Sequence, residues 1–173
     1  MWYSSIKYPN LRVFLVGDNN FNGSFPSSIS NITGLQAFDI SLNGFSGPIP
    51  PTLGSLNKLK RFHIAYNSFG SGRARDLDFL SSLTNCTQLH ILILEGNQFS
   101  GVLLDLIGNF SANLTLLNVG LNQISGIIPE GIGKLIGLTQ FIMVDNYLEG
   151  TIPDSIGKLK NLVRFALEVN NLP

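Results

Sequence analysis

The sequence has few charged residues and no net charge. Lys and Arg together number 11, and Asp and Glu also number 11, so charged side chains make up 13% of the 173 residues. That is about half of the ~25% typical of soluble domains. With no run of like charge, the chain is not suited to bind nucleic acid or an anionic membrane surface. Apolar residues make up 44%, which is enough for a core and excludes intrinsic disorder.

Cysteine is nearly absent too, since Cys86 is the only one. An intrachain disulfide framework is therefore excluded. No stretch approaches the ~18 consecutive apolar residues of a membrane span. The first ten residues have no basic stretch followed by an apolar run, so the sequence predicts no signal peptide. Taken alone, these absences are typical of a soluble chain.

What the sequence does contain is a repeat. The phrase Leu-x-x-φ-x-φ-x-x-Asn-x-φ, with φ apolar, occurs seven times in register. One such copy cannot bury its own apolar face, so copies must stack around a shared interior. We therefore expect a single domain over residues 1–173 with about seven repeats. The opening leucines are 24, 24, 30, 25, 24 and 24 residues apart and are Leu11, Leu35, Leu59, Leu89, Leu114, Leu138 and Leu162.

The first half of each repeat predicts a short strand and a bend. The φ-x-φ pair alternates with a period of two, which indicates a strand with one face turned inward, and stacked strands of this kind form a parallel sheet. An Asn follows each strand. Its amide can both donate to and accept from backbone groups that the bend leaves unpaired. These structural asparagines are Asn19, Asn43, Asn67, Asn97, Asn122, Asn146 and Asn170.

The second half of each repeat predicts the return of the chain. Gly-x-Ile-Pro occurs at residues 47–50, 126–129 and 150–153. Glycine permits the turn, and proline fixes an extended backbone. An apolar pair spaced three residues apart follows and suits a short 3₁₀ or helical return on the convex side. The pairs are Ile29/Ile32, Leu53/Leu56, Ile132/Leu135 and Ile156/Leu159.

The complete unit, Leu-x-x-Leu-x-Leu-x-x-Asn-x-Phe-Ser-Gly-x-Ile-Pro-x-x-Ile-Gly-x-Leu, resembles the plant-specific leucine-rich repeat over nearly the whole chain. The resemblance implies an α/β fold, a leucine-rich-repeat solenoid with a concave parallel β-sheet and short 3₁₀ or helical returns on the convex side. It is strongest to the ectodomains of plant leucine-rich-repeat receptor-like kinases. Residues 75–89, RDLDFLSSLTNCTQL, resemble a segment of the subgroup of immune receptors that sense bacterial protein patterns.

The chain also departs from that family. An inserted return segment covers about residues 70–88, and residues 102–104 read Val-Leu-Leu where the family pattern ends in proline. The cysteine-bearing caps, membrane span and kinase domain of the family are missing from the sequence. The resemblance therefore implies an internal fragment, a truncated gene model or a degenerate receptor copy, and the kinase activity of the family is not carried over to these residues.

Outward-facing strand positions are the candidate binding residues, because their side chains are not needed for packing. A polar cluster in the second and third repeats lies beside an apolar strip, and this combination suits an extended peptide or a protein. The alternative is a solvated face without a ligand. We expect replacement of one of these residues, Asn118, by alanine to be nearly neutral. The candidates are Asp39, Arg61, His63, Tyr66, Ile91, Ile93, Leu116, Asn118, Gln140 and Ile142.

Five Asn-x-Ser/Thr sequons are candidate glycosylation sites, at Asn22, Asn31, Asn85, Asn109 and Asn113. Such sequons are used only in secreted chains, and some arise by chance in a sequence rich in Asn and Ser. Asn31 and Asn109 occupy the same repeat position, where other copies have Ser55, Lys134 and Lys158. These two are therefore the favoured sites.

Catalytic, metal and cofactor sites are not indicated. His63 lies in no nucleophile motif, and the sequence has no Gly-x-Ser-x-Gly. Cys86 is better explained as a small buried thiol than as a nucleophile. The glycines at residues 131–137 lack the spacing of a phosphate loop. His63 and His90 lie in different columns and form no metal set. We expect no cofactor, no metal and no enzyme activity.

The sequence thus predicts a recognition segment of a plant receptor-like serine/threonine kinase in cell-surface signalling or immunity, as the resemblance implies. Its partners would be a peptide or protein ligand and, in the full-length receptor, a co-receptor kinase. It would lie on the extracellular face of the plasma membrane as part of a longer chain. The alternatives are a secreted inhibitor of the polygalacturonase-inhibitor kind and a truncated, non-functional receptor copy.

Overall fold

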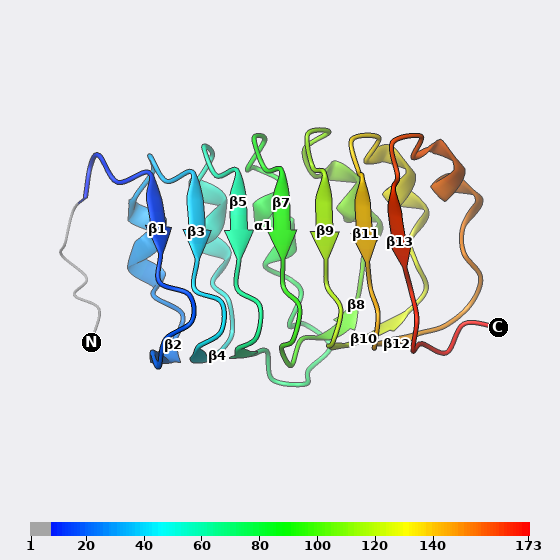
Figure 1. Ribbon diagram of the computed structural model, residues 1–173, viewed down its shortest axis with the longest axis horizontal. Coiled ribbons are helices and arrows are strands. Elements are labelled where there is room, and N and C mark those ends of the chain that lie inside the picture. Colours follow the sequence, from blue (N-terminus) through cyan, green and yellow to red (C-terminus); the bar gives the residue numbers. More distant parts are fainter. Residues whose placement is uncertain (1–7) are drawn as a thin grey trace.

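The computed structural model describes residues 8–173, so the segment in which a signal peptide was sought lies largely outside the described residues. Seven parallel strands form one sheet and follow one another in chain order (Figure 1). No helix in the described part of the chain is long and apolar enough to cross a membrane. The strands are β1 (Val13–Leu15), β3 (Ala37–Asp39), β5 (Arg61–His63), β7 (Ile91–Ile93), β9 (Leu116–Asn118), β11 (Gln140–Ile142) and β13 (Arg164–Ala166).

The register of this sheet follows the repeat. The central residue of each strand pairs with the central residue of the next, beginning with Phe14, Phe38 and Phe62. These central side chains point into the core, where the rings of the three phenylalanines stack with centroids 5.6 Å apart. A shift of one residue would turn each strand's apolar centre to the solvent. The two flanking residues of each strand point outward, and we call the surface that they form the sheet face.

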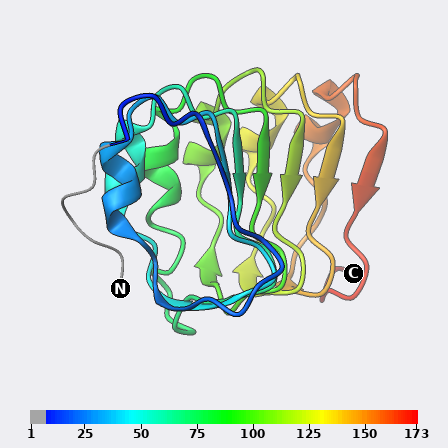
Figure 2. The same cartoon turned by 60° about the vertical axis from the view of Figure 1, so that its left-hand side comes forward.

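The returns lie on the side of the solenoid opposite the sheet (Figure 2). Five are 3₁₀ helices of five residues, and the inserted segment contributes one short α-helix. The apolar residues of each return complete the core that the strands begin. The predicted α/β solenoid is therefore confirmed. The returns are η1 (Ser27–Asn31), η2 (Pro51–Ser55), α1 (Leu80–Leu83), η3 (Asp105–Asn109), η4 (Glu130–Lys134) and η5 (Asp154–Lys158).

The structure also has two small parallel sheets that the sequence reasoning did not foresee. The first contains β2 (Asn22–Ser24), β4 (Gly44–Gly47) and β6 (Ser68–Phe69), and the second contains β8 (Ser100–Val102), β10 (Gln123–Gly126) and β12 (Tyr147–Leu148). The inserted segment separates them. Its Asp76 carboxylate accepts hydrogen bonds from the backbone N–H groups of Ser71, Arg73 and Ser100. One side chain thus closes the loop and joins it to the next coil.

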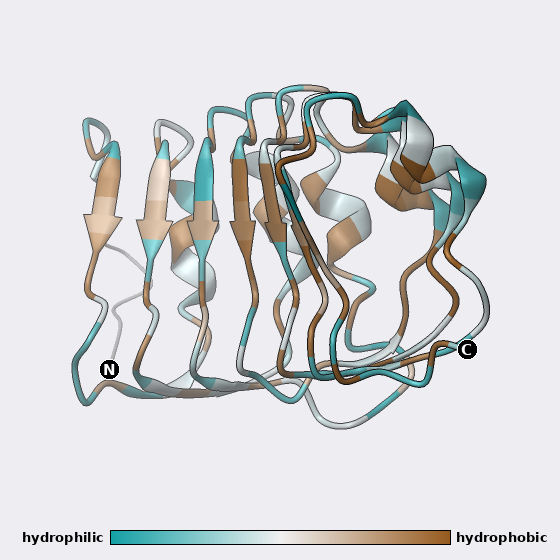
Figure 3. Ribbon diagram, turned by 45° about the vertical axis from the view of Figure 1, so that its right-hand side comes forward, coloured by the Kyte–Doolittle hydropathy of each residue, from teal (hydrophilic) through white to brown (hydrophobic). Residues whose placement is uncertain are grey.

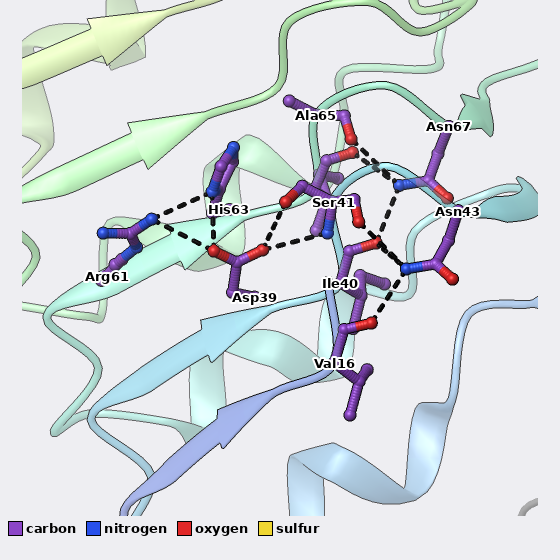
Figure 4. Close-up of polar contacts among 10 residues, drawn as sticks. Val16, Asp39, Ile40, Ser41, Asn43, Arg61, His63, Ala65 and Asn67 are labelled. Atoms are coloured by element: carbon purple, nitrogen blue, oxygen red, sulfur yellow. Dashed lines mark hydrogen bonds and ion pairs between the residues drawn. The ribbon is translucent and has the colours of Figure 1, made fainter. Parts of the chain in front are cut away.

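The structural asparagines connect one coil to the next. Asn122 Nδ2 donates to the carbonyl oxygens of Leu94, Val119 and Gly120, and its Oδ1 accepts from the N–H of Phe99 at 3.1 Å. Figure 4 shows the same donation from Asn43 and Asn67. Asn122 and Asn146 are buried, and Asn43, Asn67, Asn97 and Asn170 are half-buried. At the first coil, Asn19 is exposed, and among residues 8–173 its side chain donates only to the carbonyl oxygens of Val16 and Gly17.

The residue before each structural Asn has a left-handed backbone, which the repeat pattern alone did not indicate. In all seven coils φ at this position lies between 53° and 66°. This conformation costs roughly 1 kcal/mol for a residue other than glycine. It persists because the N–H of Leu42, for example, donates to the Ala65 carbonyl of the next coil at 2.9 Å. The seven residues are Asp18, Leu42, Tyr66, Gly96, Leu121, Asp145 and Val169.

Candidate functional site

A polar cluster of Asp39, Arg61 and His63 lies on β3 and β5 at the sheet face (Figure 4). Asp39 Oδ2 accepts from Arg61 Nη2 at 3.1 Å and from His63 Nδ1 at 2.8 Å. Asp39 Oδ1 accepts from the backbone N–H of Ser41 at 3.0 Å and from its hydroxyl at 2.6 Å. Parallel pairing of Asp39 with His63 places the two side chains next to each other. The sheet register therefore builds this cluster from three of the predicted residues.

The contacts within the cluster occupy the carboxylate of Asp39 and leave part of the Arg61 side chain exposed. Burial alone raises the pKa of Asp39, but the hydrogen bonds from Ser41 and the proximity of His63 outweigh it and hold that pKa below its usual value. Because four donors already occupy this carboxylate, it has little capacity for a ligand. Arg61 Nε is buried without a partner among the described residues. The Arg61 side chain is 41% exposed and the His63 side chain 19%, so Arg61 is the more accessible donor of the cluster.

The geometry does not support hydrolytic chemistry. In a Ser-His-Asp triad the histidine takes the proton of the serine hydroxyl. Here Ser41 and His63 both donate to Asp39, so the cluster contains no serine–histidine hydrogen bond. Cys86 is buried, and burial raises the pKa of its thiol to about 11, which keeps it protonated. No group of His, Cys, Asp and Glu in residues 8–173 could hold a metal ion.

An apolar strip lies beside the cluster. Ile91 and Ile93 of β7 pair with Arg61 and His63, and all four side chains are half-buried. Figure 3 shows the change from hydrophilic β5 to hydrophobic β7. The half-buried Leu116 of β9 and Gln140 of β11 extend this surface.

Ile142 does not belong to the strip, contrary to the expectation for outward-facing residues. It points to the sheet face but is only 4% exposed. The following coil covers it, because its strand partner Ala166 is also buried. In the last two coils, a side chain that points outward from its strand is therefore not necessarily exposed to a ligand.

A second set of hydrogen-bonded polar side chains, Tyr66, Glu95 and Asn118, lies at the ends of β5, β7 and β9. The Tyr66 hydroxyl donates to Glu95, and burial together with this carboxylate raises the pKa of Tyr66. Asn118 Nδ2 donates to Glu95 Oε2 at 3.0 Å. Gly96 makes room for the tyrosine ring, since a Cβ there would lie 2.6 Å from Tyr66 Cδ1. Tyr66 is therefore separated from the Asp39 cluster in its hydrogen bonding, although both belong to the same face.

The expectation that Asn118 has no structural role is wrong. Its side chain is only 8% exposed, and its Oδ1 accepts from the buried N–H of Gly120 at 3.0 Å. Asn118→Ala leaves this N–H without a partner, so we expect the free energy of unfolding to fall by about 1–3 kcal/mol. Urea denaturation measures the change. Gln140→Ala is the control on the same sheet face, where no side-chain hydrogen bond is lost among the described residues, and equal losses in the two variants would contradict the assignment.

Sequence reasoning missed Ser41 and Glu95. Both occupy the position two residues after the last strand residue, which in the other coils is glycine, alanine, valine or glutamate. The repeat alignment contained this column, but its outward direction is not evident from alternation because the backbone leaves the strand there. The five sequon asparagines are all exposed.

Comparisons with known proteins agree with this architecture. The model of the family described as Leucine Rich Repeat matches residues 10–32, 34–56, 88–110 and 113–135, which is more than half of the chain. The receptor kinase-like protein Xa21 of Oryza sativa subsp. japonica is 48% identical over 63 residues, covering 36% of this chain and 6% of that protein. The chain therefore spans only a small part of the length of the curated relatives it matches.

Two solved plant ectodomains are similar over nearly the whole chain. The receptor kinase GASSHO1/SCHENGEN3 ectodomain of Arabidopsis thaliana, in complex with CASPARIAN STRIP INTEGRITY FACTOR 2, has a TM-score of 0.84 and 33% identity over 94% of this chain and 19% of its own. The Arabidopsis receptor kinase HAESA ectodomain, in complex with an N-terminally extended IDA peptide hormone ligand, has a TM-score of 0.84 and 32% identity over 95% of this chain and 27% of its own.

Proposed function

Since the chain belongs to the leucine-rich repeat proteins, we propose that it is a ligand-recognition segment of a plant receptor kinase ectodomain. Its curated relatives include receptor kinases, and the two similar ectodomains are solved with their ligands. The proposal assigns no catalysis to these residues. In the full-length protein the segment would lie on the extracellular face of the plasma membrane, where a co-receptor kinase could join the ligand-bound receptor.

The observation that carries this proposal is the composition of the sheet face. Donors from Arg61 and His63 lie directly beside the half-buried Ile91 and Ile93. Binding surfaces combine apolar contact with a few placed polar groups in this way. An extended peptide with an acceptor group next to an apolar side chain fits the arrangement, because Asp39 is already occupied by its own donors.

Binding through the sheet face can be measured without knowing the natural ligand. A display library of random extended peptides is selected on the chain, and the affinities of the selected peptides are then measured on variants. Arg61→Gln and Ile93→Thr should each weaken binding by about tenfold, equivalent to ~1.4 kcal/mol. Lys134→Gln, on the exposed return side, is the matched control. Peptides that lose affinity only with the control variant would refute the sheet face as the recognition surface.

Two other functions remain alternatives: a secreted inhibitor of the polygalacturonase-inhibitor kind, and a degenerate receptor copy without function. Sequencing of full-length transcripts distinguishes them. A membrane span and a kinase in the same reading frame support the receptor. A reading frame that ends after the repeats, together with inhibition of a cell-wall polygalacturonase by the secreted protein, supports the inhibitor. A reading frame of that kind without inhibition and without any peptide affinity supports the degenerate copy.

A further inference from the structure

One hollow in the described part of the molecule lies on the return side, away from the sheet face. It is a groove of about 1320 Å³ between the returns of the first three coils. None of the described residues that line it carries a charge, and most present a hydroxyl or an amide. Two of these hydroxyls bond to each other, Ser30 Oγ and Thr52 Oγ1 at 2.9 Å, and Ser55 Oγ donates to the Ser30 carbonyl oxygen at 2.7 Å. Such a lining suits a neutral, hydroxyl-rich occupant better than a charged or apolar one.

Two sequon asparagines stand in the wall of this groove. Asn31 ends η1 and Asn85 follows α1, and both line the groove with exposed side chains. Neither side-chain amide nitrogen (Nδ2) donates a hydrogen bond to any residue between 8 and 173. Asn85 Nδ2 also lies over η2, since a Cβ on Gly54 would be 3.2 Å from it. A group attached to either amide nitrogen therefore starts inside the groove.

The structure shows that these two asparagines share one repeat position with a third, Asn109. Each follows a buried apolar residue by two positions and precedes another by one, as Leu83 and Cys86 do around Asn85. The insertion hides this equivalence in the sequence, where only Asn31 and Asn109 align at one repeat position. Returns η1, η2, α1 and η3 pack in that order, so the three asparagines form a row with Ser55 between the first two.

We propose that this groove is a cradle for the chain's own N-linked sugars, attached at Asn31 and Asn85, and that Asn109 continues the glycosylated row. This inference rests on the proposed function in one respect, since both require passage through the secretory pathway. Attachment forms a bond from the amide Nδ2 to C1 of the first N-acetylglucosamine of a lipid-pyrophosphate-linked oligosaccharide. The C1–O bond breaks, the lipid pyrophosphate leaves with the electron pair, and the amide nitrogen loses one proton.

The two remaining sequons lie elsewhere and provide internal controls. Asn22 belongs to β2, and Asn113 lies in the bend before β9, where its N–H donates to Ser111 Oγ at 3.1 Å. Neither lines the groove. Sugars at these two positions would not enter it. A row of bulky hydrated sugars along the returns would exclude protein partners from that side and leave the sheet face for recognition.

The experiment uses the 173-residue chain secreted from plant cells behind a cleavable leader. Glycopeptide mass spectrometry reports which sequons are occupied, and hydroxyl-radical footprinting reports which side chains are covered. Tyr8 lines the groove and is 51% exposed without sugar, whereas Tyr147 of β12 is 56% exposed on another face. We expect Asn31 and Asn85 to be occupied. Enzymatic removal of the sugars should then raise oxidation of Tyr8 several-fold and leave Tyr147 unchanged.

Variants separate the cradle from a general effect of sugar. Thr33→Ala with Thr87→Ala removes both groove sequons but keeps the asparagines, and should give Tyr8 the reactivity of the deglycosylated chain. Thr115→Ala, which removes the Asn113 sequon, should leave Tyr8 protected. Bare Asn31 and Asn85, or a Tyr8 equally reactive with and without sugar, would overturn the proposal. Because the leader imposes secretion, either result is independent of whether the sheet face binds peptides.

Discussion

Gly133→Ala is expected to lower the free energy of unfolding by about 3 kcal/mol, the upper range for overpacking a close contact. Gly133 lies in η4, and a Cβ there would be 2.6 Å from both the Cβ and the carbonyl oxygen of Ser155 in the next coil. A backbone atom cannot move aside as a flexible side chain can. The coils would have to separate locally, which removes apolar contacts on both sides. Urea denaturation followed by circular dichroism measures the loss.

Gly157→Ala is the matched control, because Gly157 occupies the same repeat position one coil later. No heavy atom lies within 4 Å of a Cβ built there. Alanine also restricts the unfolded chain more than glycine does, so we expect the free energy of unfolding of this variant to rise by about 0.5 kcal/mol. The two substitutions are thus expected to change the free energy of unfolding in opposite directions. This difference tests whether glycine is required by the close approach of neighbouring coils and not by the backbone conformation. Equal destabilisation of the two variants would point to conformation instead.

Asn122→Ala should lower the free energy of unfolding by about 3 kcal/mol, because one side chain satisfies four backbone groups in a buried bend. The Phe99 N–H loses its acceptor, and the three carbonyl oxygens that Nδ2 contacts lose a donor. Asn122→Asp should be nearly as harmful, since a carboxylate accepts from Phe99 but places negative charge against those carbonyl oxygens. Thermal and urea denaturation both report this effect.

Asn19→Ala provides the corresponding control at the first coil. Asn19 is exposed, and within the described part of the chain its side chain donates to only two carbonyl oxygens, which water can satisfy after the substitution. We expect the free energy of unfolding to fall by about 0.5 kcal/mol. If the exposed and buried positions respond alike, the asparagines act by favouring the bend conformation and not by pairing buried groups.

The sheet, the stacked coils and the asparagine positions could be predicted from the sequence because each depends on spacing alone. A period of two within the strand and a period near 24 between copies determine which side chains meet, whatever the identity of the neighbours. The polar cluster was predictable for the same reason, since parallel pairing at equal register places Asp39 beside Arg61 and His63.

Accessibility could not be predicted in the same way. Ile142 and Asn118 occupy outward positions but are covered by neighbours, and burial depends on the volumes of adjoining coils rather than on spacing. The two small sheets were missed because their strands are two to four residues long and carry no alternation. The left-handed position before each asparagine was missed because leucine, tyrosine and valine do not signal it.

The equal register of the seven-stranded sheet also sets a length scale for anything laid across it. Neighbouring strands recur every ~4.8 Å, whereas an extended chain advances ~3.3 Å per residue, so three residues of such a chain match about two coils. The six intervals between β1 and β13 span about 29 Å, the length of roughly nine extended residues. Because successive side chains of an extended chain point to opposite faces, side chains that occur every sixth residue in a partner would meet equivalent positions about four coils apart.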